Sequence, residues 1–207
     1  MLDSKGFDLW ADDYDKSVNL CEESNEYPFA GYKNVLGTIY QIIKSGPGMK
    51  ILDVGFGTGI LAKKLYDEGY SVYGMDFSEK MIEIAAAKMP EAVLCRHDFT
   101  KGFPEDFKNQ QFDFIICTYA IHHLSVSEQK NFIRELVEHL ALQGKILIGD
   151  VAFETIEELN RCRKESGDDW DDEEIYPVAE VLRADFPKIQ FKKVSFCAGV
   201  LLLQKQS

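Results

Sequence analysis

A carboxylate followed by three alternating glycines marks the first segment of the chain that suggests chemistry. Residues 50–59 read KILDVGFGTG, with Asp53 ahead of Gly55, Gly57 and Gly59. The apolar residues of 51–54 predict a buried strand, the glycines permit a sharp turn, and 60–66 predict the helix that follows. Together they form a niche of nucleotide size. Asp53 would repel a pyrophosphate but attract a ligand with an amino group, and the spacing differs from G-x-G-x-x-G.

Two further acids follow predicted strands. Asp76 lies 17 residues after Gly59, and an acid about 20 residues past a glycine loop can accept hydrogen bonds from a ribose diol. An N-cap role for Asp76 is the alternative, but Ser78 suits the helix that begins at Glu79 better. Phe77 and Met81 would then flank an adenine ring. Asp98 ends the next strand, and ligands of open parallel sheets bind beyond the carboxyl ends of strands.

The fourth predicted strand leads into a pair of histidines. Residues 112–124 read FDFIICTYAIHHL, and the buried part, 114–117, would deliver Thr118 and Tyr119 to the same edge of the sheet. Adjacent side chains on a strand or loop diverge, and the other two histidines, His97 and His139, are distant from the pair in the sequence. The pair therefore predicts no metal site. His122 and His123 are left as pocket walls or proton acceptors, or as packed loop residues.

These motifs resemble those of the class I S-adenosylmethionine-dependent methyltransferases. The resemblance rests on D-x-G-x-G-x-G at 53–59, on A-x-H-H-L at 120–124, and on W-A-x-x-Y-D at 10–15. It runs from about residue 7 to residue 153 and is nearest to the uncharacterised bacterial YrrT-like group. It implies that Asp53 meets the methionine ammonium, that Asp98 accepts from the adenine amine beside Phe99, and that Tyr14 faces the pocket under an N-terminal cover.

The implied activity is methyl transfer from S-adenosylmethionine to a small-molecule acceptor, with S-adenosylhomocysteine as product. The candidate proton acceptors are His122, His123 and Tyr14. The predicted donor-binding residues are Tyr14, Asp53, Gly55, Gly57, Asp76, Phe77, Met81, Asp98, Phe99, Thr118, Tyr119 and His123. A tRNA-modifying enzyme and a non-catalytic S-adenosylmethionine-binding module are the alternatives. The glycine spacing argues against an NAD-dependent oxidoreductase, and the residues at 118–121 lack the Asn/Asp-Pro-Pro-aromatic motif of DNA amino-methylating enzymes.

Alternating strand and helix patterns predict an α/β fold. We expect a Rossmann-like three-layer sandwich with a mostly parallel seven-stranded sheet and a C-terminal antiparallel hairpin. The predicted strands are 51–54, 71–75, 92–96, 112–117, 145–151, 189–196 and 199–204, the last two joined by a tight turn at 197–199. The predicted helices are 61–67, 79–88, a segment with apolar positions from 132 to 140, 155–163 and 175–186. Capping boxes are expected at Ser125 and Thr155.

One domain accounts for the whole chain, 1–207. Within it we expect an N-terminal helical cap (1–45), a cofactor-binding core (50–151) and acceptor-side helices with the closing hairpin (152–207). The acidic run 166–174 predicts a solvated loop, although Trp170 within it leaves open a mobile lid.

The composition limits the classes of binding partner and the cellular compartment that we expect for the protein. The 207 residues carry a net charge of −12, which disfavours DNA and anionic membranes and makes tRNA an unfavourable substrate. The start lacks the apolar core of a signal peptide, and no apolar run reaches membrane-spanning length. Five cysteines without a C-x-x-C pair indicate buried thiols in a reducing cytoplasm. Either a monomer or a homodimer is compatible with the sequence.

Overall fold

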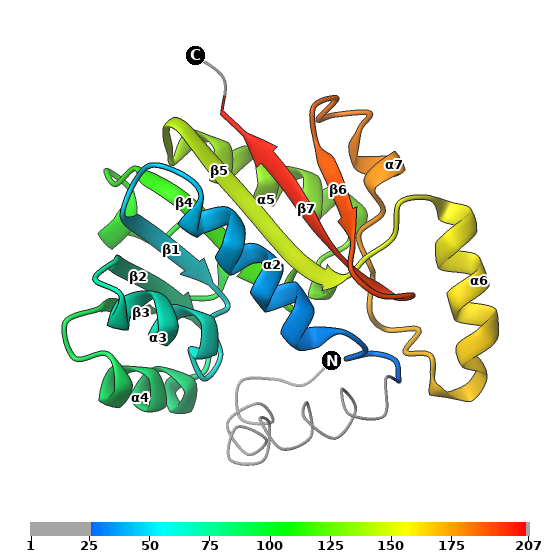
Figure 1. Ribbon diagram of the computed structural model, residues 1–207, viewed down its shortest axis with the longest axis horizontal. Coiled ribbons are helices and arrows are strands. Elements are labelled where there is room, and N and C mark those ends of the chain that lie inside the picture. The colour runs from blue at the N-terminus through cyan, green and yellow to red at the C-terminus, as the bar shows by residue number, and fades with distance from the viewer. Residues whose placement is uncertain (1–25, 206–207) are drawn as a thin grey trace.

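A seven-stranded sheet organises the protein in the computed structural model, which describes residues 26–205 (Figure 1). The strand order is β3-β2-β1-β4-β5-β7-β6. The strands are β1 (Lys50–Val54), β2 (Ser71–Asp76), β3 (Val93–Arg96), β4 (Phe112–Thr118), β5 (Leu140–Val151), β6 (Gln190–Lys193) and β7 (Ala198–Gln204). β1 to β5 pair in parallel, whereas β7 is antiparallel to both β5 and β6. This confirms the predicted fold class.

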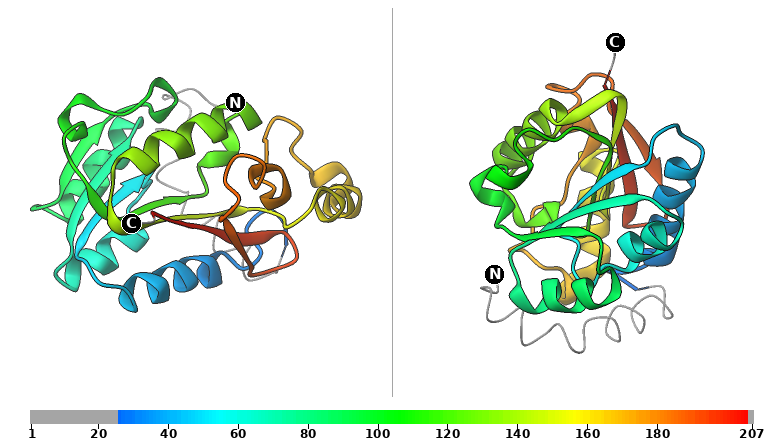
Figure 2. Two further views of the ribbon diagram at one scale, coloured as in Figure 1. Left: turned by 90° about the horizontal axis from the view of Figure 1, so that it is seen from above. Right: turned by 90° about the vertical axis from the view of Figure 1, so that its left-hand side faces the viewer.

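Helices cover both faces of the sheet and make three layers (Figure 2). They are α2 (Tyr32–Lys44), α3 (Ile60–Asp67), α4 (Glu79–Lys88), α5 (Val126–Glu138), α6 (Ile156–Ser166) and α7 (Ala179–Leu182). Neighbouring strand residues alternate between two cores, because successive side chains point to opposite faces. Ile51 packs with residues of α2 and α3, while Leu52 packs with residues of α5 and α7. Both faces are therefore apolar, which explains the continuous apolar runs in the sequence.

The sequence signals for helix starts are largely confirmed. The Ser78 hydroxyl accepts a hydrogen bond from Met81 N, and Ser125 and Glu128 form a complete capping box. Thr155 caps α6 in the same way, but the carboxylate of Glu158 accepts from Glu154 N rather than from Thr155. The box predicted at Thr155 is thus only half formed.

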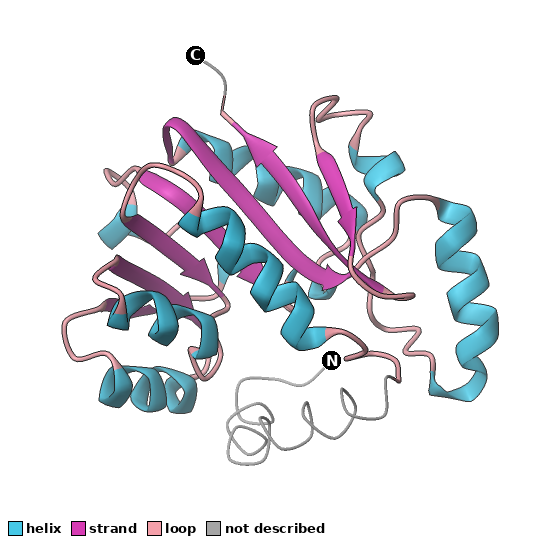
Figure 3. Cartoon of the chain, in the orientation of Figure 1, coloured by secondary structure: helices cyan, strands magenta, loops and turns pink. Residues whose placement is uncertain are grey.

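The helix predicted over 175–186 forms only in part, and both of its ends are wrong. Residues 167–178 run without an α-helix, and α7 covers only Ala179–Leu182 (Figure 3). Pro177 disfavours helical backbone at the residue before it, and backbone pairing replaces the helix. Ile175 N donates to His122 O at 2.8 Å, and Phe153 N donates to Pro177 O at 3.1 Å.

Two strand boundaries also differ. The hairpin turn lies at 194–197 rather than 197–199, because Val194 N and Ser195 N both donate to Ala198 O. β6 therefore ends at Lys193. β5 begins at Leu140, which the helical pattern had assigned to the preceding helix, and its register against β4 shifts between Phe112 and Phe114. No helix within residues 26–205 is both long and apolar enough to cross a membrane.

Candidate active site

A cavity of about 430 Å³ opens at the carboxyl ends of β1, β2, β4 and β5. Its size lies in the range of small-molecule sites. It is lined by these predicted residues: Asp53, Gly55, Gly57, Asp76, Phe77, Met81, Phe99, Thr118, Tyr119, His122 and His123. The structure thus brings together most of the residues predicted from the ends of separate strands. Tyr14 lies outside the described residues.

The glycine loop and Asp76 form one hydrogen-bonded unit. Gly57 N donates to Asp76 Oδ2 and Ser78 N donates to Asp76 Oδ1, both at 2.9 Å. Gly55 has φ +67°, and a Cβ there would lie 2.8 Å from the Cβ of Ala120. Glycine is therefore required at Gly55 on both conformational and steric grounds. Each carboxylate oxygen can accept more than one hydrogen bond, so Asp76 can hold the loop and still receive ligand hydroxyls.

Asp53 is a buried acid that faces this cavity. The residue is 2% exposed, and Oδ1 has no hydrogen-bond partner among the described residues. Burial, reinforced by the nearby charge of Asp76, raises the pKa of Asp53 well above its usual range. A cation in the cavity would relieve both effects. This buried carboxylate is therefore suited to the methionine ammonium group that the family resemblance implies for Asp53.

Asp98 is arranged differently from the other two acids. Its carboxylate accepts from Thr100 N at 3.0 Å and from Thr100 Oγ1 at 2.6 Å, and it pairs with Lys101 Nζ at 3.0 Å. These partners together hold the pKa of Asp98 below its usual range even though burial acts in the opposite direction. Asp98 is not part of the cavity lining, whereas Phe99 is. The adenine contact of Asp98 stays a prediction.

An aromatic wall closes the cavity from the side of α2. Tyr119 follows β4 in the left-handed region, with φ +50°, a conformation that costs a non-glycine residue free energy. Its ring lies 5.0 Å from that of Tyr32 and 5.6 Å from that of Phe29, measured between centroids. The strained backbone therefore directs Tyr119 against the segment that precedes and opens α2.

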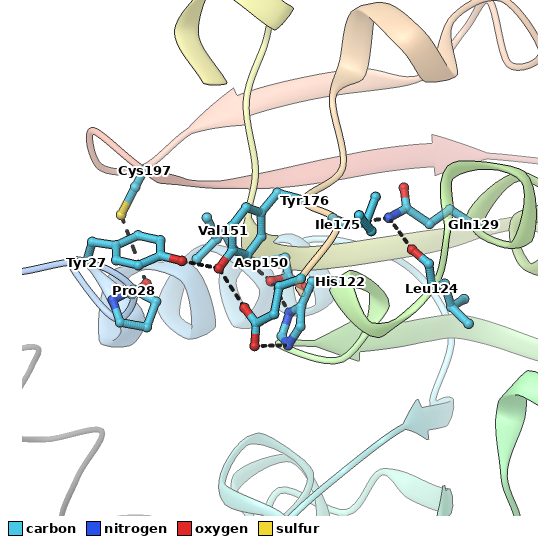
Figure 4. Close-up of polar contacts among 11 residues, drawn as sticks. Tyr27, Pro28, His122, Leu124, Gln129, Asp150, Val151, Ile175, Tyr176 and Cys197 are labelled. Atoms are coloured by element: carbon cyan, nitrogen blue, oxygen red, sulfur yellow. Dashed lines mark hydrogen bonds and ion pairs between the residues drawn. The ribbon is translucent and has the colours of Figure 1, made fainter. Parts of the chain in front are cut away.

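The far end of the cavity holds a buried histidine between two acids (Figure 4). His122 Nδ1 lies 2.7 Å from Asp150 Oδ1, and His122 Nε2 lies 3.5 Å from Glu174 Oε1. Burial alone would lower the pKa of His122, but the charge and hydrogen bond of Asp150, with the charge of Glu174, outweigh it and raise the pKa. Burial and the charge of His122 lower the pKa of His123 to about 4.

A chain of hydroxyl groups fixes Glu174. Tyr176 donates to Glu174 Oε2 at 2.6 Å, so Tyr27 must donate to the Tyr176 hydroxyl, and Asp171 N donates to Tyr27 at 3.2 Å. Trp170 stacks on Tyr27 with centroids 5.2 Å apart, and it meets Tyr176 edge-on at 5.0 Å. The acidic run is thus anchored by its tryptophan, and Asp171, Glu173 and Glu174 line the cavity.

The sequence analysis missed Asp150, Glu174 and the tyrosines Tyr27 and Tyr176. Asp150 could have been found, because it lies near the end of a predicted strand in the same way as Asp53, Asp76 and Asp98. Nothing in the sequence distinguishes Glu174 from its acidic neighbours. The adjacent histidines also converge where divergence was expected: residues 121–123 form a 3₁₀ turn, and the two rings lie 4.2 Å apart.

The strand order, the glycine loop and the acids at the carboxyl ends of β1 and β2 define a class I methyltransferase. Residues 51–144 match the family model of a methyltransferase domain. An uncharacterized methyltransferase of Oceanobacillus iheyensis is 33% identical over 198 residues, covering 92% of this chain and 89% of the relative. One from Geobacillus kaustophilus is 34% identical over 194 residues, covering 89% and 86%. The chain belongs to the family of S-adenosylmethionine-dependent methyltransferases.

Solved structures share the fold at low sequence identity. The magnesium protoporphyrin IX methyltransferase of Synechocystis with bound S-adenosylhomocysteine has a TM-score of 0.67 at 19% identity, covering 86% of this chain and 85% of the other. DhpI in complex with S-adenosylhomocysteine has a TM-score of 0.67 at 14% identity, covering 99% and 95%. These neighbours support the architecture around the cavity.

Proposed function

We propose that the protein transfers a methyl group from S-adenosylmethionine to a small-molecule acceptor bound at the His122 end of the cavity. The observation that carries the proposal is the continuity of this cavity, which joins the Asp53 and Asp76 end to the His122 and Glu174 end. S-Adenosylmethionine supplies a methyl group on a positively charged sulfur, which is already a good leaving group. The protein then has mainly to align the two reactants.

The donor end is formed by Asp53, the glycine loop and Asp76. Asp53 would pair with the methionine ammonium, because its carboxylate is desolvated and Oδ1 lacks a partner among the described residues. Asp76 would accept from the ribose hydroxyls while its bonds to Gly57 N and Ser78 N keep it in place. Phe77, Met81 and Phe99 supply apolar cavity walls suited to the adenine ring.

The acceptor end is formed by His122, His123 and the acidic residues that follow Trp170. An acceptor atom that must lose a proton would meet the two imidazole rings here, and Asp150 stabilises positive charge on His122. Asp171, Glu173 and Glu174 make this wall negative. A phosphate backbone would be repelled by it, which favours a small molecule over tRNA.

Product analysis tests the proposal. The protein is incubated with S-adenosylmethionine and panels of small amines, thiols, alcohols and carboxylic acids, with bulk tRNA as a separate arm, and S-adenosylhomocysteine is measured by mass spectrometry. Turnover with a small molecule is expected. Turnover with tRNA alone would overturn the assignment of the acceptor. Tight S-adenosylmethionine binding without turnover in any arm would favour the non-catalytic binding module.

A further inference from the structure

Three potential metal ligands converge at the acceptor end of the cavity. Within the described part of the chain, His122, His123 and Glu174 each offer one ligand atom, and these atoms all lie within 4.8 Å of one another. His122 is buried, and the other two are partly exposed at the cavity surface. We propose that these three side chains bind a divalent transition-metal ion that holds the methyl acceptor, an inference that rests on the proposed function and refines it.

The orientation of His122 provides the first argument. Because Asp150 Oδ1 lies 2.7 Å from Nδ1, the proton of the neutral ring belongs on Nδ1. Nε2 then carries a lone pair, and it faces the carboxylate oxygen Glu174 Oε1 at 3.5 Å. Two electron-pair donors that face each other at this distance repel each other unless a positive charge lies between them. A proton could satisfy these two atoms, but the third donor, His123, favours a metal ion.

Each of two proposed ligands is held by a second hydrogen-bonding group (Figure 4). Asp150 holds His122, while Tyr176 donates to Glu174 Oε2 at 2.6 Å and leaves Oε1 toward the histidines. Metal-binding histidines commonly donate their other ring N–H to a carboxylate in this way, which fixes the ring orientation. The arrangement therefore has the outer hydrogen bonds that a metal site needs, in addition to the ligands.

The backbone around the site is also fixed. Ile175, next to Glu174, donates its N–H to His122 O at 2.8 Å, and the buried Gln129 amide donates to Ile175 O at 2.6 Å (Figure 4). Glu174 and His122 are thus tied together through main-chain contacts as well as side chains. Such preorganisation lowers the cost of bringing the ligands together.

The donor set selects the kind of ion. Two imidazole nitrogens and one carboxylate suit Zn²⁺, Fe²⁺ or Mn²⁺, whereas Mg²⁺ and Ca²⁺ prefer oxygen ligands. Three protein ligands leave coordination positions open toward the cavity for a hetero atom of the acceptor. A coordinated X–H group is a stronger acid. The coordinated acceptor group would release its proton to solvent. Its hetero atom X would then form a bond to the methyl carbon while the S–CH₃ bond breaks and its electron pair moves to sulfur.

Metal titrations test the inference without any acceptor. Chelator-treated full-length protein is titrated with Zn²⁺ by calorimetry and with Co²⁺ by visible absorption, and folding of every variant is checked by thermal melting. One equivalent of each ion is expected to bind. His123→Ala and Glu174→Gln should each weaken binding at least about 100-fold, and Asp150→Asn about 10- to 100-fold. Asp168→Asn, at an exposed position of the same acidic run outside the cavity lining, and His97→Gln, which lies outside the group, should bind as the unmodified protein does.

The outcomes separate this inference from the proposed function. Absence of stoichiometric binding by both ions, or binding unchanged in both His123→Ala and Glu174→Gln, would overturn the metal site. Production of S-adenosylhomocysteine by the chelator-treated protein would leave the methyl transfer standing while removing the metal from it. Metal binding with no turnover on any acceptor would support the metal site and count against the proposed function.

Discussion

Replacing Asp53 with asparagine should affect ligand affinity and protein stability in opposite directions. Asp53 is 2% exposed, and Oδ1 has no partner among the described residues, so the charge of the carboxylate is stabilised mainly when a cation enters the cavity. Hydrogen bonds to charged groups contribute about 1.5–3 kcal/mol. Asp53→Asn should therefore weaken binding of S-adenosylhomocysteine, which carries the same ammonium, by roughly 10- to 150-fold.

The pH dependence of the unliganded protein follows from the raised pKa of Asp53. Because its pKa is higher in the folded than in the unfolded protein, the folded state binds the proton more tightly. The buried charge therefore destabilises the protein at high pH, and this penalty disappears as the pH falls from the folded to the unfolded pKa. Asp53→Asn removes the penalty, so its free energy of unfolding should exceed that of the unmodified protein at high pH and approach it at low pH.

Ligand binding should show the converse. Below the pKa of Asp53 in the folded protein, an ammonium can pair with Asp53 only after the carboxyl group loses its proton. The affinity for S-adenosylhomocysteine should therefore decrease as the pH is lowered, and binding should release protons. Calorimetry in buffers of different ionisation enthalpy measures this release, which should vanish in Asp53→Asn. Asp106→Asn removes one charge at an exposed position outside the cavity and serves as the control. Equal affinity and equal proton release in Asp53→Asn and the unmodified protein would refute the assignment of Asp53 to the ammonium.

Four other changes test the remaining parts of the site. Asp76→Ala should weaken S-adenosylhomocysteine binding by about 1–3 kcal/mol, and unchanged affinity by calorimetry would contradict the ribose assignment. Gly55→Ala should cost more thermal stability than Gly57→Ala, because both have positive φ but only the new methyl group at Gly55 meets Ala120; equal melting temperatures would argue against that contact. Trp170→Ala should raise the Michaelis constant for the acceptor more than that for the donor, because Trp170 packs on the tyrosines that hold Glu174; a selective effect on the donor would be the contrary result. Removal of residues 1–15 should reduce turnover more than stability, and failure of the truncated protein to fold would show that this segment belongs to the core.

The sequence predicted the sheet well because its signals are local. Strands such as β1 and β4 are buried on both faces and appear as short apolar runs, and the starts of α4 and α5 are marked by Ser78 and Ser125. The helix predicted over 175–186 was wrong at 175–178 for a different reason. Their apolar spacing is helical, but backbone pairing of Ile175 with His122 and of Phe153 with Pro177 outweighs it. Such pairing joins segments that are distant in sequence.

The same distinction applies to the site. Asp53 and Asp76 could be predicted because the ends of parallel strands share one edge of the sheet, and Asp150 follows the same rule. Asp98 also lies after the end of a parallel strand, but its carboxylate accepts local hydrogen bonds from Thr100 instead of lining the cavity. Glu174 could not be predicted, because its role depends on Tyr176 and on a 3₁₀ turn at 121–123 that brings His122 toward it.

The place of β7 in the sheet has a consequence for the order in which the protein matures. β7 lies between β5 and β6, and within residues 26–205 β6 pairs with no other strand. The last-synthesised strand of the described chain must therefore be inserted before β6 can join the sheet. Until then β5 presents an open edge suited to intermolecular pairing. Partly synthesised chains, or chains cut before Ala198, should accordingly depend on chaperones and be prone to aggregation.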